Sequence, residues 1–258
     1  MSHKAGGRVA PLHVDTIAGR TSRTVLLLHG GGVGGWMWQP LIERLGHERT
    51  YLVPDLPGHD HSANQDYRSH RDTVDALVRV IESQAGGSVS VVGFSLGAQL
   101  AVLLAAERPD LVDRVTVISA QAKPTRFPAA TLAMLGLAAP LAKNERFARA
   151  QAKELFIPAD LFSDYLRVSR SLSTATLIAS VGENISFTIP PAWASFPGSA
   201  LMLVGAEERQ MMKTSADSLA QVHARGAAEV VDGCGHGIPL QEPAWLAERL
   251  RRWLPSSH

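Results

Sequence analysis

The sequence predicts an α/β protein with a mostly parallel, twisted sheet and helices on both faces. Three observations support this fold class. Short apolar runs alternate with helical patterns along most of the chain. The segments between successive runs are long enough to hold a crossover helix, which parallel strands require. Finally, a β-branched run breaks at a glycine-rich turn and continues as a helix between Ser88 and Pro109. At 258 residues the chain is long enough for one large domain.

The elements follow in order along the chain. Apolar runs predict a weak edge strand within 8–18, buried strands at 24–28 and 114–119, and further strands at 51–53, 89–92, 200–204 and 228–231. Apolar residues at helical spacing predict helices from about residue 40, and over 72–84, 96–108, 213–225 and 243–254. Ligands on such sheets bind at the carboxyl ends of the strands, so we expect the functional residues at that edge.

The alternation of strands and helices stops between residues 122 and 190. This segment has apolar residues at helical spacing and is broken by prolines, among them Pro128, Pro140 and Pro158. We expect it to form a helical cap inserted into a core domain that comprises residues 1–121 and 191–258. The alternative is that it forms further outer-layer helices of the core.

Composition excludes several classes of partner. The chain has 25 Lys and Arg against 24 Asp and Glu, without a long basic run, so we expect no nucleic-acid partner. It has no apolar stretch long enough for a signal peptide or a bilayer span, so we expect a cytoplasmic protein without stable membrane insertion. Its single cysteine, Cys234, cannot form an internal disulfide. The sequence does not predict the oligomeric state.

The turn that follows the strand at 89–92 carries the pattern Gly-x-Ser-x-Gly. Its residues are Gly93, Phe94, Ser95, Leu96 and Gly97. A turn this tight crowds its neighbours, so residues without a Cβ let the strand and the helix approach each other. We therefore expect a nucleophile elbow, with Ser95 strained and raised above the sheet at the positive end of the helix.

A serine hydroxyl needs an adjacent base, and that base needs an orienting carboxylate. His236 is the best candidate for the base, because it lies in a glycine-flanked loop after a strand at the same edge of the sheet. Glu208, on the loop after the strand at 200–204, is the best candidate for the acid, and Glu207 is the alternative. The loop after the strand at 114–119 contains no Asp or Glu.

Backbone amides would stabilise the oxyanion in such a site. One N–H would come from Leu96, directly after the nucleophile, and the second from Gly31 or Gly32 in the glycine loop 30–35. This loop lacks the Gly-Lys-Ser/Thr ending of a P-loop, so nucleotide binding is not expected. Four large apolar residues flank the loop and the nucleophile, and we expect them to contact substrate or else to pack in the core: Trp36, Met37, Trp38 and Phe94.

One further loop, residues 54–62, contains two histidines on either side of an acidic residue. His59 and His61 flank Asp60 there. Alternate residues on a loop, with no further cluster of ligands, favour local hydrogen bonding over metal binding. We therefore predict no metal site.

These motifs together resemble the α/β-hydrolase superfamily, in the order nucleophile, acid, histidine. The resemblance covers residues 24–254 and rests on four segments: His29 to Gly32, Gly93 to Gly97, Gly205 to Glu208, and Gly235 to Gly237. It implies a Ser-acid-His triad, a core sheet of about eight strands, a variable helical lid and no cofactor. The chain departs from the pattern in having Glu208 where many relatives carry Asp, and Asp60 where Gly is frequent.

The sequence thus predicts a serine hydrolase that cleaves carboxylic esters of apolar small molecules through an acyl-enzyme. A serine nucleophile argues against the dehalogenase and epoxide hydrolase branches, which use Asp. Lactonase, thioesterase, carbon–carbon bond hydrolase and cofactor-free perhydrolase reactions remain alternatives on the same triad. A non-catalytic ligand-binding protein of the same fold is the alternative from another class.

Overall fold

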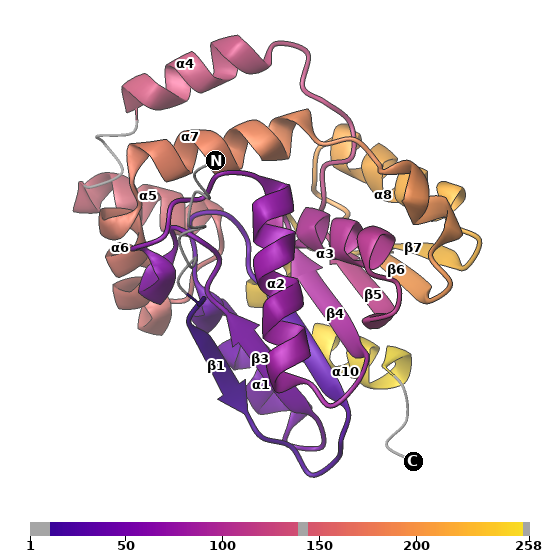
Figure 1. The fold of residues 1–258 in the computed structure, drawn as a ribbon. Helices are drawn as coiled ribbons and strands as arrows, with labels where there is room; N and C mark the ends of the chain where they lie inside the picture. The colour runs from indigo at the N-terminus through magenta and orange to yellow at the C-terminus, as the bar shows by residue number, and fades with distance from the viewer. Residues whose placement is uncertain (1–10, 139–143, 255–258) are drawn as a thin grey trace, which may run out of the picture.

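The central sheet runs through the whole molecule. The computed structural model describes residues 11–138 and 144–254, and Figure 1 shows their fold. The strands are β1 (Val14–Ile17), β2 (Thr24–Leu28), β3 (Thr50–Pro54), β4 (Val89–Phe94), β5 (Val112–Ile118), β6 (Ser199–Gly205) and β7 (Gly226–Val231). Their order is β1-β3-β2-β4-β5-β6-β7. The β1/β3 pair is antiparallel and all other pairs are parallel, which confirms the predicted mostly parallel sheet.

The described residues hold seven strands, one fewer than the resemblance implied. The number eight came from the family, whereas the residues themselves supply seven strand-like runs. Only one such run precedes the buried strand at Thr24, and it forms the antiparallel edge strand β1.

Helices cover both faces of the sheet. The core helices are α1 (Gln39–Leu45), α2 (His70–Gln84), α3 (Leu96–Glu107), α8 (Gln210–Val222), α9 (Ile238–Gln241) and α10 (Pro243–Trp253). Successive side chains of a strand point to opposite faces, and β2 shows the result. Leu26 and Leu28 pack in the core under α2, α3 and α8, whereas Val25 and Leu27 pack in the core under α1 and α10. The unbroken apolar run of β2 is therefore buried on both sides.

The described residues between β5 and β6 form four α-helices, in the segment that the sequence marks as helical. They are α4 (Pro128–Ala138), α5 (Glu145–Glu154), α6 (Phe162–Ser171) and α7 (Thr174–Ser186), and Figure 1 shows α5, α6 and α7 gathered at one end of the sheet. Pro128 is the first residue of α4, where its missing N–H costs nothing. The predicted break at Pro140 lies outside the described residues.

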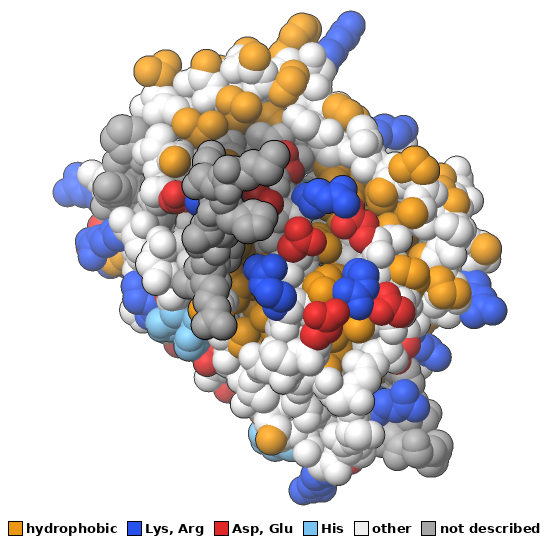
Figure 2. Space-filling model, viewed as in Figure 1, with side chains coloured by type: hydrophobic (Ala, Val, Ile, Leu, Met, Phe, Trp, Pro, Cys, Tyr) orange, Lys and Arg blue, Asp and Glu red, His pale blue; other side chains and the backbone are white. Residues whose placement is uncertain are grey.

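The outermost of these helices, α4, packs against α7 and leaves much of its apolar surface open. Met134 and Leu137 are 72% and 84% exposed. Figure 2 shows hydrophobic side chains along the upper edge of the molecule, where α4 lies. No helix among residues 11–138 and 144–254 is both long and apolar enough to cross a bilayer.

Candidate active site

Ser95 lies at the sharp turn between β4 and α3. Its backbone has φ 52° and ψ −112°, a region that costs a non-glycine residue about 1–3 kcal/mol. A hydrogen bond of 2.8 Å from the Ser95 amide to the carbonyl of Ile118 on β5 holds this conformation. The flanking glycines explain how the turn closes. A Cβ on Gly97 would lie 2.3 Å from the carbonyl oxygen of Leu28, and one on Gly93 would lie 2.3 Å from the carbonyl oxygen of Gly97.

Three side chains from distant parts of the chain form a hydrogen-bonded series. The distance from Ser95 Oγ to His236 Nε2 is 3.2 Å, and the distance from His236 Nδ1 to Glu208 Oε2 is 2.9 Å. Because Nδ1 lies against a carboxylate, it carries the ring proton, and the lone pair of Nε2 faces the serine hydroxyl. This is the arrangement in which an imidazole can accept a proton from a serine.

Glu208 is the carboxylate that contacts the histidine, whereas the neighbouring Glu207 is exposed. The Glu208 side chain is only 2% exposed. Its second oxygen, Oε1, accepts hydrogen bonds from Ser119 Oγ at 2.6 Å and from the Gly205 amide at 3.0 Å. Burial alone would raise the pKa of Glu208, but hydrogen bonds from His236 and Ser119 lower it below its ordinary value. The carboxylate is therefore ionised at neutral pH.

Ser119 is a site residue that the sequence did not reveal. It follows β5 directly and has a positive φ of 55°. The loop beyond it contains no carboxylate, and Ser119 instead donates a hydrogen bond to the acid Glu208. The sequence feature that could have identified Ser119 is its place as a polar residue at the carboxyl end of a central strand.

The loop that carries His236 is fixed by its neighbours. The Gly235 amide donates to Gln241 Oε1 at 2.9 Å, and the rings of His236 and Phe94 have centroids 5.1 Å apart. A Cβ on Gly237 would lie 2.7 Å from the ring of Phe156, which belongs to the helical segment between β5 and β6. The small residue thus lets that segment pack directly against the histidine loop.

The glycine loop beside the nucleophile is fixed by His29. The His29 ring is fully buried, with Nδ1 donating to the carbonyl of Gly30 at 2.7 Å and Nε2 accepting from the Leu56 amide at 2.9 Å. Burial lowers the pKa of His29 to about 4, so the ring is neutral and can make both bonds. Gly32 has φ +77°, a conformation that glycine adopts without strain.

A cavity of about 320 Å³ lies over Ser95 and His236. The core contributes the predicted residues Gly31, Gly32, Met37, Phe94 and Leu96 to its wall. The inserted helices contribute mostly apolar side chains, among them Leu135, Phe147, Tyr165, Leu177 and Val181. Among the described residues that line it, none is Lys, Arg, Asp or Glu.

Two of the four large residues expected near the substrate lie elsewhere. Trp38 is completely buried in the core under α1 and α10, and Trp36 packs against the same core. Neither lines the cavity, whereas Met37 and Phe94 do. The sequence could not separate these residues, because a short 3₁₀-helix at Gly35–Trp38 sets the direction of each side chain.

Asp60, where the resembled family often has Gly, has an explanation in the structure. Its backbone has a positive φ of 43°, which glycine would adopt more easily. Its carboxylate accepts two hydrogen bonds of 2.9 Å from Nε and Nη2 of Arg167 on α6. The Asp60 side chain is 3% exposed. At this position an aspartate strains the backbone, but it gives the core a charged contact with the inserted helices that a glycine could not make.

Comparisons with known proteins find similar sequences along most of the chain. The model of the alpha/beta hydrolase family matches residues 25–249. The chain is 24% identical over 249 residues to (E)-2-((N-methylformamido)methylene)succinate hydrolase of Acinetobacter baylyi, covering 90% of each chain.

Solved structures share the fold at lower identity. An esterase of Exiguobacterium antarcticum superposes with a TM-score of 0.80 at 18% identity, covering 95% of this chain and 96% of that one. An enol-lactonase of Burkholderia xenovorans superposes with a TM-score of 0.79 at 17% identity, covering 94% and 96%. By the match to the family model along most of its length, the chain belongs to the alpha/beta hydrolase family.

Proposed function

We propose that this chain is a serine hydrolase that cleaves carboxylic esters of apolar small molecules through an acyl-enzyme. The observation that carries the proposal is the series from Ser95 Oγ through His236 to Glu208, with distances of 3.2 and 2.9 Å. Its members have the roles of nucleophile, base and orienting acid. The cavity above them supplies the space for a substrate.

In the first step, Ser95 Oγ attacks the ester carbonyl carbon while His236 Nε2 takes the hydroxyl proton. The resulting imidazolium is stabilised by Glu208, which stays ionised. The negative charge moves to the former carbonyl oxygen. We assign its stabilisation to the amide of Leu96, at the N-terminus of α3, and to an amide of Gly31 or Gly32.

The tetrahedral intermediate then collapses and the C–O bond to the alcohol breaks. His236 gives its proton to the departing alkoxide, which leaves as the alcohol, and the acyl group remains on Ser95. A water molecule repeats the sequence, with His236 again taking a proton, and releases the carboxylic acid. The serine and the imidazole return to their starting states.

The wall of the cavity favours neutral, apolar substrates. Its described residues offer no cation to pair with a substrate carboxylate. We therefore do not transfer the succinate-derived substrate of the A. baylyi relative to this chain. The volume of about 320 Å³ is at the small end of the usual range of about 300–1,000 Å³ for small-molecule sites. We also propose that residues 122–190 form a cap that closes this site from above.

A panel of neutral p-nitrophenyl esters of increasing acyl length tests the proposal, together with lactones, thioesters and a monomethyl ester of a dicarboxylic acid. Saturable hydrolysis of short neutral esters, lost in the variant S95A, is the expected result. Saturable binding without steady-state turnover would instead identify a ligand-binding protein. Preference for the charged monomethyl ester would contradict the assignment of an apolar substrate.

A further inference from the structure

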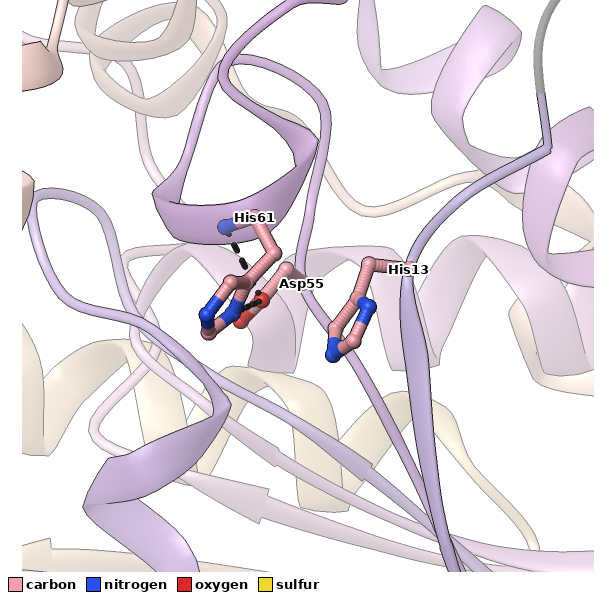
Figure 3. Close-up of side chains that lie close together, drawn as sticks. All are labelled: His13, Asp55 and His61. Carbon is pink, nitrogen blue, oxygen red and sulfur yellow. Dashed lines mark hydrogen bonds and ion pairs between the residues drawn. The ribbon is translucent and has the colours of Figure 1, made fainter.

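A second cluster of chemically reactive side chains lies on the core, outside the cavity. Candidate ligand atoms of His13, Asp55 and His61 all lie within 4.8 Å of one another. Figure 3 shows the two imidazole rings on either side of the carboxylate. We propose that these three residues bind one divalent transition-metal ion, and that zinc is the ion they fit best. The proposal does not rest on the hydrolytic mechanism, which uses none of them.

Backbone contacts bring the three residues together. In the antiparallel β1/β3 pair Val14 is opposite Pro54, and the next pair along is His13 and Asp55. The amide of Asp55 donates to the carbonyl of His13 at 3.0 Å. Residues opposite each other across an antiparallel pair place their side chains on the same face.

His61 reaches the same place from another segment. It lies in the 3₁₀-helix η2 (Asp60–Ser62), and its amide donates to Asp55 Oδ2 at 3.2 Å. Ser62 Oγ in turn accepts from the amide of His13 at 3.0 Å. The main chain of all three candidate ligands is therefore fixed before any ion binds.

The side chains of the three proposed ligands lie close together, and neighbouring groups hold two of them in place by hydrogen bonds. His61 Nδ1 lies 3.0 Å from Asp55 Oδ2, and the ring centroids of His13 and His61 are 4.5 Å apart. The other oxygen of Asp55 accepts from the Gly35 amide at 2.8 Å, which orients the carboxylate. His13 Nε2 lies 3.2 Å from Asp15 Oδ1, a carboxylate–histidine contact of the kind that supports ligands in metal sites.

The donor set matches zinc in both chemistry and space. Two imidazole nitrogens and one carboxylate oxygen are typical ligands of Zn²⁺, whereas Mg²⁺ and Ca²⁺ take oxygen ligands. Zinc bonds of about 2.0–2.2 Å place neighbouring ligand atoms roughly 3–4 Å apart, so small side-chain shifts suffice. Asp55 is buried, and the side chains of His13 and His61 are 39% and 54% exposed, which leaves the rings free to turn and the ion open to solvent.

Binding would connect the edge strand β1 to the loop that carries η2. In the metal-free protein the His61 ring donates its Nδ1 proton to Asp55. The ion would take the place of that proton on Nδ1, and the proton would move to Nε2, so that the ring stays neutral as a ligand. A water molecule completes the four ligands that zinc prefers.

The test uses the full chain without a histidine tag, dialysed against a chelator and titrated with ZnCl₂ by calorimetry and with CoCl₂ by visible absorption. We expect one ion per chain, cobalt bands typical of tetrahedral coordination, and a rise in Tm of about 5–10 °C at a hundredfold excess of zinc over Kd. Asp55 is left intact, because it also holds the glycine loop. H13A and H61A should each weaken binding at least tenfold.

Two control variants test whether zinc binding depends on this cluster alone. His47 is exposed and outside the cluster, so H47A should bind zinc as the wild type does. H236A should also retain binding, which separates the site from the triad. Absence of one-to-one binding, an octahedral cobalt spectrum, or unchanged affinity in both H13A and H61A would overturn the proposal. The cobalt spectrum of the wild type decides the question even if a variant fails to fold.

Discussion

The substitution E208Q tests the role of the carboxylate with the least change of shape. In the wild type, Glu208 Oε1 accepts from Ser119 and Gly205 while Oε2 accepts from His236. A glutamine has one acceptor oxygen and one donor NH₂ group. If its oxygen keeps the bonds to Ser119 and Gly205, the NH₂ faces His236 Nδ1, and the ring must move its proton to Nε2.

The opposite amide orientation is more costly. It would set the NH₂ against the buried Gly205 amide, leaving donors unsatisfied at a cost of about 1–3 kcal/mol. The shift of tautomer is therefore the favoured outcome, and a ring protonated on Nε2 cannot accept the proton of Ser95. We expect kcat to fall by about 10³–10⁴, which corresponds to about 4–5.5 kcal/mol of barrier.

The assay is steady-state hydrolysis of a short p-nitrophenyl ester, with circular dichroism to confirm that each variant is folded. E207Q is the matched control, since Glu207 is exposed and should leave kcat unchanged. S95A and H236A should each lower kcat more than E208Q does. The double variant S95A/H236A should have a kcat little lower than either single variant, because the two residues act as one unit. An E208Q rate within tenfold of the wild type, or a damaging E207Q, would refute the reasoning.

Three further predictions concern stability. G93A should lower the free energy of unfolding by about 3 kcal/mol or more, since its Cβ would lie 2.3 Å from a backbone oxygen. G86A, whose Cβ would meet nothing within 4 Å, should change it by less than about 0.5 kcal/mol; equal Tm values for the two variants would contradict the account of the elbow. R167A should lower the free energy of unfolding by about 1–3 kcal/mol, because it removes both hydrogen bonds from Arg167 to the buried Asp60 carboxylate. Arg167 is half-exposed, so this loss should be smaller than that for a fully buried ion pair. D60G should lower the free energy of unfolding by less than R167A does, because glycine adopts the positive φ without strain and leaves no buried charge. Thermal melts in which D60G is the less stable variant would contradict this explanation. Lastly, burial lowers the pKa of His29 to about 4 and that of His59 to about 3, from an ordinary value of 6.5. Both histidines bind protons more tightly in the unfolded chain, so their contribution to stability is complete above pH 6.5 and is lost as the pH falls toward 4. We expect a loss of about 2 kcal/mol per histidine between pH 7.5 and 5, and an unchanged urea midpoint would contradict it.

Most of the fold could be predicted from local patterns in the sequence. The apolar run of β2 and the glycines at 93 and 97 each have a direct physical reason within a few residues, so the parallel sheet and the elbow could be predicted. The seven strands were present as seven runs. The figure of about eight came from the resemblance, and the described residues hold seven.

The site was harder to predict where its contacts join distant segments. Ser119 supports Glu208 from 89 residues away, and Arg167 reaches Asp60 across 107 residues. No spacing in the sequence encodes these pairs, because they depend on how the inserted helices and the strand ends pack. The proximity of His13 to Asp55 likewise depends on the β1/β3 register rather than on any spacing in the sequence.

The central claim, that Ser95 is a nucleophile activated by His236, is tested most directly by labelling with a fluorophosphonate probe. The account predicts stoichiometric labelling of the folded protein, mapped by peptide mass spectrometry to Ser95, lost in S95A and strongly slowed in H236A. Folded protein that stays unlabelled, or a label at another serine, would contradict it.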